Sequence, residues 1–396
     1  MLAPEKTRHL LLPVVLLAAT RWIEYTGLRM VYPFMPEIAR GLGVDLAAVA
    51  SVVALRSGLG LAGPLVGSFA ERHSRKAMMI LGMGIFGMGF LIVSLSPTFP
   101  AFVAALAAIG LSRVVIGPAM HAYLGDNVGY HQRGLAVGAT EFGYAGAYLV
   151  GMPLIGWMIA RGGWTSPFPW LAALSFAGAV GLACALPSQP AHRRQAEPFL
   201  QGLQSIARHP SAIACLLTTF LLAAGNENIG VVYGAWMEGG FGLHVAALGA
   251  ATAVIGLADL GGEGLVAFVT DRLGKKRAVV LGASLNAASS LVLPFLGQTL
   301  PGALAGLFAF YLTFEFAIVS LIPIVTEMLP EARGTLLASN MGAHAAGRAV
   351  AALAALALFE SGLLGNGLVT ALLDMFALGL LVLFVRFGKE TETSRG

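Results

Sequence analysis

The sequence predicts an all-α membrane protein with twelve transmembrane helices, arranged as two six-helix parallel repeats. Three observations favour this fold class. Of the 396 residues, 57% are hydrophobic and only 11% are charged, which leaves too little polar surface for a water-soluble domain. The apolar runs are about 20 residues or longer, enough to cross a bilayer as a helix. A charged stretch at positions 71–76 also returns at positions 271–276.

The apolar runs place the twelve spans in order along the chain. We expect the first six near positions 10–36, 47–68, 77–95, 101–122, 134–159 and 168–187. The second six are expected near positions 211–235, 246–270, 278–297, 302–326, 334–358 and 363–385. The chain then divides into an N-terminal half (1–187), a polar cytoplasmic linker (188–210) and a C-terminal half (211–396).

The distribution of Lys and Arg predicts the orientation in the membrane, because these residues resist translocation and accumulate in cytoplasmic loops. With the N-terminus inside, seventeen of them face the cytoplasm, and only Arg40 and Arg161 face out. We therefore expect a multi-pass plasma-membrane protein with both termini in the cytoplasm. This basic rim accounts for the sequence pI of about 9.2, so no nucleic-acid partner is expected.

Matched landmarks in the two halves support a duplication. The pair Arg133–Gly134 returns 200 positions later as Arg333–Gly334, and Val31–Tyr32 returns 201 positions later as Val232–Tyr233. Both halves begin inside and hold an even number of spans. They are therefore expected to share one topology and to be related by an axis along the membrane normal.

A charged loop follows the second span of each half, as Glu71–Lys76 and as Asp271–Lys276. With the two six-span halves and their linker, these loops resemble the major facilitator superfamily, whose signature at this place is Gly, three spacers, Asp, Arg, a spacer, Gly and two basic residues. The resemblance implies a cytoplasmic gate in which Asp126 partners Arg72 or Arg75. The implied gating residues are Glu71, Arg72, Arg75, Asp126, Asp271 and Arg272; the alternative is that the basic residues only fix topology.

Two further stretches resemble motifs of proton-coupled members of this superfamily. Leu111–Gly117 contains Arg113, and an Arg near the membrane centre costs about 2.5–3.5 kcal/mol, so we expect it to face the interior with a partner. Gly151–Gly156 resembles the Gly-Pro motif of drug-exporting antiporters, with Met152 splitting the Gly-Pro pair. The alternatives are that Arg113 only braces a buried carboxylate and that the small residues of the fifth span only pack.

Charged residues inside the first half suggest a wet, functional interior. Arg21 and Glu24 are three positions apart in the first span and can pair on one helix face. Glu24 is the best proton carrier of this half, and a static pair with Arg21 is the rival interpretation. Tyr25 and Arg29 extend the same polar stripe, while Glu141 and Tyr144 share a face of the fifth span.

The second half carries a surplus of acids, with Arg348 as the opposing base. Asp259 and Glu263 lie one turn apart, so one of the two should hold a proton unless a cation joins them. Proton coupling is the simplest explanation, and sodium is an alternative. The predicted proton-coupling set is Glu24, Arg113, Glu141, Glu227, Asp259, Glu263 and Glu315.

A cavity between the halves is the expected substrate site, because transporters with internal repeats bind near the midplane. The predicted substrate-binding residues are Tyr25, Arg29, Tyr144, Asn226, Tyr233, Tyr311, Asn340 and His344; for His344, a packing role is equally open. We expect a proton-coupled transporter that works by alternating access and exports a small amphipathic, drug-like molecule in exchange for protons. Four Arg residues expected to be buried in the first half favour the alternative of an organic anion or lipid-like substrate: Arg21, Arg29, Arg56 and Arg113.

The remaining expectations concern enzyme activity, cofactors, the energy source and the partners of the protein. No metalloprotease motif, nucleophile elbow or phosphate loop occurs, so an enzyme is not expected, and neither is a cofactor or a metal ion. The proton gradient would supply the energy. A channel or a non-transporting scaffold is a further alternative, although neither explains acids in both halves. We expect the protein to act as a monomer in contact with membrane lipid.

Overall fold

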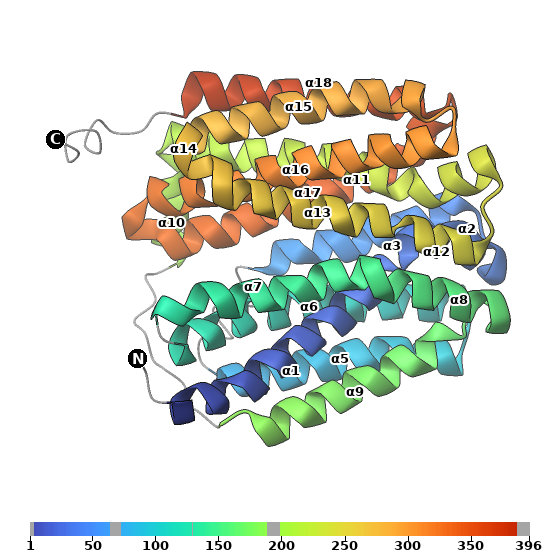
Figure 1. Ribbon diagram of the computed structural model, residues 1–396, viewed down its shortest axis with the longest axis horizontal. Helices are drawn as coiled ribbons and strands as arrows, with labels where there is room; N and C mark the ends of the chain where they lie inside the picture. The colour runs from blue at the N-terminus through green and yellow to red at the C-terminus, as the bar shows by residue number, and fades with distance from the viewer. Residues whose placement is uncertain (1–3, 64–72, 129, 188–198, 386–396) are drawn as a thin grey trace.

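The computed structural model describes residues 4–63, 73–128, 130–187 and 199–385. Every regular element within these residues is a helix, which confirms the predicted fold class. Figure 1 shows the helices lying roughly parallel in two groups: α1 and α5 to α9 lie below, α11 and α13 to α18 lie above, and α2, α3 and α12 lie between them. Helix α1 begins and α18 ends at the left end of this view, which also holds α10.

The N-terminal group contains the elements up to residue 185. In chain order they are α1 (Pro4–Arg29), α2 (Val31–Leu42), α3 (Leu46–Gly58), the 3-10 turn η1 (Leu59–Ala62), α5 (Arg75–Leu95), α6 (Phe99–Asn127), α7 (Tyr130–Gly146), the π-helical turn η2 (Ala147–Gly151), α8 (Met152–Gly162) and α9 (Pro167–Ala185). Because Pro153 has no N–H to donate, the regular bonding of the helix is interrupted where η2 meets α8.

The C-terminal group begins with a short helix inside the stretch predicted as a linker. In order, the elements are α10 (Phe199–Ala207), α11 (Pro210–Phe241), α12 (Val245–Ala251), α13 (Ala253–Leu265), the π-helical turn η3 (Val266–Thr270), α14 (Asp271–Leu273), α15 (Lys275–Leu296), α16 (Leu300–Met328), the 3-10 turn η4 (Pro330–Ala332), α17 (Arg333–Phe359) and α18 (Leu363–Phe384). Helix α10 packs against α11 and α17, so it belongs to this group.

Among the described residues, ten helices are long and apolar enough to cross a membrane. They correspond to the third to twelfth predicted spans. The second predicted span appears as the shorter apolar helix Leu46–Ala62, beyond which the chain leaves the described residues. The first span is formed by α1 and α2, whose charged residues lower its hydropathy.

The first predicted span is broken near its end, not continuous. Helix α1 ends at Arg29, and α2 starts at Val31 after a turn at Met30. Pro33 explains the break, since it has no N–H for the carbonyl of Arg29 and its ring crowds that carbonyl. As a result, Tyr32 turns toward the second half of the protein.

The two halves pack against each other through several pairs of helices. At the end opposite α10, α8 packs against α12 and α2 against α11, while α3 packs against α17 along the interface. A methyl group added at Gly249 of α12 would lie 2.5 Å from the Met152 carbonyl oxygen, and one at Gly234 of α11 would lie 2.6 Å from the Tyr32 carbonyl oxygen. Only glycine permits such close backbone contact, so we call this the closed end.

Candidate functional site

A cavity of about 510 Å³ lies between the two halves. Its lining comes from helices of both groups, including α1, α3, α6 and α7 on one side and α11, α13, α16 and α17 on the other. The volume is in the range of sites that bury a small organic molecule. The sequence prediction of a cavity between the repeats agrees with this geometry.

The cavity extends toward the end where α1 begins and α18 ends. Its lining reaches Gly334, in the first turn of α17, and Pro118 and Ile322, in the C-terminal halves of α6 and α16. In the other direction it stops at Arg29, Arg56 and Arg348, beyond which the closed end begins. The conformation therefore gives access from the side that the distribution of Lys and Arg predicts to be cytoplasmic.

A buried network of four side chains forms the floor of the cavity, and we call it the Tyr32 network. Arg56 donates to the Tyr32 hydroxyl at 2.7 Å, and this hydroxyl donates to Glu227 Oε1 at 2.7 Å. Arg348 Nε donates to Glu227 Oε2 at 2.8 Å, and Arg348 Nη2 donates to the Tyr32 hydroxyl. All four residues are at least 93% buried. Since Tyr32 and Arg56 belong to one half and Glu227 and Arg348 to the other, the network joins the halves.

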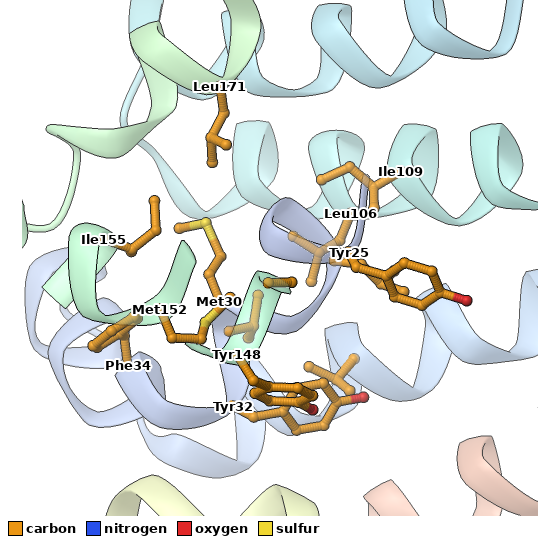
Figure 2. Close-up of a cluster of buried hydrophobic side chains, with 14 of the residues drawn as sticks. Tyr25, Met30, Tyr32, Phe34, Leu106, Ile109, Tyr148, Met152, Ile155 and Leu171 are labelled. Carbon is orange, nitrogen blue, oxygen red and sulfur yellow. The ribbon is translucent and has the colours of Figure 1, made fainter. Parts of the chain in front are cut away.

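Figure 2 shows how the apolar packing around α2 positions the aromatic residues of this region. Phe34, Met152 and Ile155 lie together on one side of the cluster, and the hydroxyl oxygens of Tyr25 and Tyr32 lie on the side away from them. Phe34 and Met152 are fully buried. This packing fixes the ring of Tyr32 so that its hydroxyl reaches the network.

A second charged group lies on α1 and α7. Arg21 Nη1 is 3.5 Å from Glu24 Oε2, as the sequence spacing predicted, and Arg21 Nη2 is 3.6 Å from Glu141 Oε1. His121 Nε2 lies 3.8 Å from the same Glu141 oxygen. Glu24 is fully buried and lies outside the cavity lining, whereas Glu141 lines the cavity. Glu141 is therefore the carboxylate of this group that borders the cavity.

Two cavity-lining Arg residues are held by aromatic rings. The guanidinium of Arg113 lies 5.2 Å from the centre of the Tyr25 ring, and that of Arg29 lies 5.7 Å from the Tyr144 ring. Arg29 also donates to the Tyr144 hydroxyl at 3.2 Å. Among the described residues neither forms an ion pair with a carboxylate. The predicted partner of Arg113 is thus an aromatic face, which cation–π attraction stabilises.

Two acids of the C-terminal half face the cavity from the opposite side. Glu263 of α13 and Glu315 of α16 line it, and neither forms an ion pair within the described part of the chain. Asp259, one turn before Glu263, is 98% buried and lies outside the lining, and its Oδ2 has no hydrogen-bond partner there. The pair predicted from the sequence is therefore split between the cavity and the interior.

The remaining predicted substrate-binding residues fall into two groups. Tyr25, Tyr144, Asn226, Asn340 and His344 line the cavity, and Asn340 accepts a hydrogen bond from Thr219 at 2.6 Å. Tyr233 and Tyr311 instead line a separate void of about 10 Å³, enough for about one water molecule. Arg29 and Asn226 border both spaces, and Glu227 borders the void.

The described residues of the two charged loops lie at the end toward which the cavity extends, which we call the open end. Arg75 Nε is 3.8 Å from Asp126 Oδ2, one of the two partnerships that the family resemblance implied. Ser74, which stands where the signature has Gly, accepts a hydrogen bond from the Ala77 N–H and caps α5. Glu71 and Arg72 lie outside the described residues, as does the side chain of Asp271, and Arg272 is exposed. In the second loop, Lys275 Nζ lies 2.5 Å from Glu327 Oε2.

The Tyr32 network was not among the predicted site residues as a unit. Glu227 was predicted as a proton carrier, Arg56 and Arg348 only as buried charges, and Tyr32 only as a repeat landmark. Its counterpart Tyr233 donates instead to the Leu248 carbonyl at 3.2 Å, within its own half. The available signal was a tyrosine next to a proline in a charged span, but sequence alone does not show which way such a break turns the ring.

A family model described as Major Facilitator Superfamily matches residues 17–224, more than half of the chain. The chain belongs to the major facilitator superfamily. It is 26% identical over 334 residues to the MFS-type transporter YceJ of Bacillus subtilis, covering 84% of this chain and 85% of the relative. It is also 24% identical over 296 residues to Multidrug resistance protein 2 of the same bacterium, covering 71% and 74%.

Solved structures agree on the fold. A D-xylose–proton symporter superposes with a TM-score of 0.78 at 15% identity, covering 96% of this chain and 98% of the symporter. As a member of the major facilitator superfamily, the protein is a multi-pass membrane transporter for a small-molecule substrate and not an enzyme. It is a secondary transporter that works by alternating access.

Proposed function

We propose that this transporter couples the movement of a small amphipathic molecule to the movement of protons. The observation that carries the proposal is the composition of the cavity wall. Phe314, Ile318 and Ile322 provide an apolar surface, and Glu263 and Glu315 provide carboxyl groups without an ion-pair partner in the described structure. An apolar body fits the first surface, and a carboxyl group that lines the cavity and forms no ion pair in the described structure can take up and release a proton.

The other predicted proton carriers would act through the charged groups that contact them. Glu141 shares Arg21 with Glu24, so a proton on Glu141 would strengthen the Arg21–Glu24 pair. Glu227 lies in the Tyr32 network, so its protonation would weaken a contact between the halves. Arg113 would set the charge of the cavity wall opposite Glu263 and Glu315. A sodium ion at these acids is the alternative coupling ion.

Export in exchange for protons is the first candidate direction. It is supported by the names of two relatives in Bacillus subtilis, Multidrug resistance proteins 1 and 2. With the termini in the cytoplasm of a plasma-membrane protein, the cavity would be open inward and ready to take up a compound for export. The second candidate, an organic anion or lipid-like substrate, is favoured by Arg29 and Arg113, which contact aromatic rings and have no carboxylate partner among the described residues.

Transport by purified protein in proteoliposomes tests the proposal. A pH gradient should drive accumulation of an amphipathic substrate from a labelled panel, and a protonophore should abolish it. Glu315→Gln and Arg113→Ala should lose this coupled flux while still inserting, whereas Glu360→Gln, at an exposed site, should retain it. Flux that survives the protonophore would exclude proton coupling, and a sodium gradient would then be applied.

The same panel separates the two candidates. If both lipophilic cations and anions compete with the labelled substrate, export of drug-like compounds is supported. If only anions compete, the drug-export candidate fails and the organic-anion candidate stands.

A further inference from the structure

Three buried N–H groups in the cavity lining lack a hydrogen-bond partner among the described residues. They are Arg113 Nη1, Arg29 Nε and the Asn226 side-chain amide nitrogen. Asn226 is itself 93% buried. Native proteins satisfy nearly all buried donors, so a group without a protein partner at a binding site indicates where a ligand atom or an ordered water belongs.

The buried side-chain atoms of the described lining that have no hydrogen-bond partner are all donors. Buried acceptors without a partner do occur, such as Glu24 Oε1, Asp259 Oδ2 and both carboxyl oxygens of Asp374, but all of them lie outside the lining. Within the described lining, the buried side-chain atoms without a partner are donors. A ligand that complements them must therefore present acceptors.

The charges of these donors point to an acidic ligand group. Arg21 and Arg348 are neutralised by carboxylates, whereas Arg29 and Arg113 contact aromatic rings. Arg29, Arg113 and Arg348 line the same cavity as His344. A guanidinium presents its N–H groups in a plane that matches two carboxylate oxygens, a match that ammonium or amide ligands cannot provide.

We propose that the substrate carries an oxyanion of the carboxylate class, held by Arg113 and Arg29 with Asn226 as a further donor. Its apolar body lies along Phe314, Ile318 and Ile322, toward the open end. The inference rests on the proposed function, because it takes the cavity as the transport site. It narrows the amphipathic substrates to organic acids.

Binding of three probes that share one apolar body tests the inference. We would measure the change in melting temperature of the purified, detergent-solubilised protein with 2-naphthoate, 2-naphthamide and 2-naphthylmethylammonium, since a ligand of the folded state raises it by mass action. The naphthoate should raise the melting temperature at concentrations at least tenfold lower than the other two.

Variants assign the preference to the named donors. Arg113→Gln should weaken naphthoate binding about tenfold or more, because it removes a charged hydrogen-bond donor, and Arg113→Lys should recover part of the loss. Asn226→Ala should weaken it less. Arg161→Gln, which removes an Arg that lies over the Trp157 ring outside the cavity lining, is the matched control and should bind as the wild type does.

The outcomes separate this inference from the proposed function. Equal or tighter binding of the ammonium or the amide, no binding of any probe, or wild-type naphthoate binding by a folded Arg113→Gln protein overturns the oxyanion site. Naphthoate binding that depends on Arg113, without any proton-driven flux in proteoliposomes, supports the site and overturns the proton coupling. Proton-driven flux without a preference for acids supports the proton coupling and overturns the oxyanion site.

Discussion

Replacing Tyr32 by Phe should loosen the closed end. The Tyr32 hydroxyl makes three hydrogen bonds, and two of them, to Glu227 and from Arg348, join the two halves. Hydrogen bonds to charged groups contribute about 1.5–3 kcal/mol each, so up to about 3–6 kcal/mol of contact between the halves is lost. Water recovers part of this when the end opens. We therefore expect a shift toward opening at the closed end of at least tenfold, or about 1.4 kcal/mol.

Distances between spin labels across the closed end measure this shift. Labels at Arg161 and Gly239, both exposed and on different halves, would report separation once Cys184 and Cys215 are replaced. Tyr233→Phe is the matched control, because its hydroxyl bonds to a carbonyl of its own half. If Tyr32→Phe leaves the distance distribution of the wild type unchanged, the network does not hold this end closed.

Three further predictions concern buried contacts. Glu227→Gln should lower thermal stability by about 3–5 kcal/mol, because it leaves Arg348 buried without its carboxylate, and adding Arg348→Gln should restore part of that loss in a melting experiment. Gly249→Ala should disfavour the closed end by about 1–3 kcal/mol, seen with the same spin labels, whereas Gly264→Ala, which meets nothing within 4 Å, should be neutral. Asp374→Asn should preserve the melting temperature, because the fully buried carboxyl has no partner among the described residues for a negative charge; a large loss would mean that a cation is bound there.

The fold followed from the sequence because it depends on signals that are local or repeated. The length of the spans and the repeated charged loop can be recognised in the sequence without knowing which residues are in contact. The Arg21–Glu24 pair was also predictable, since three positions on a helix define a shared face whatever surrounds it.

The site was predictable only as a set of residue types. Glu227 and Arg348 are 121 positions apart, and nothing in the sequence pairs that acid with that base in preference to the other buried charges. Asp259 and Glu263 lie one turn apart, yet only Glu263 lines the cavity, because which of them does so depends on how the neighbouring helices pack. Hydrophobic pattern gives the period of a helix but not its rotation relative to a partner half.

The two repeat-related tyrosines have taken opposite tasks. Tyr32 ties one half to the other, and Tyr233 ties two helices of a single half together. If both copies had kept the same role, two tyrosines would join the halves, and opening at the closed end would require both contacts to break. Because Tyr32 joins the halves and Tyr233 does not, a single substitution can change how often the closed end opens. Such a change leaves the contacts within the C-terminal half intact.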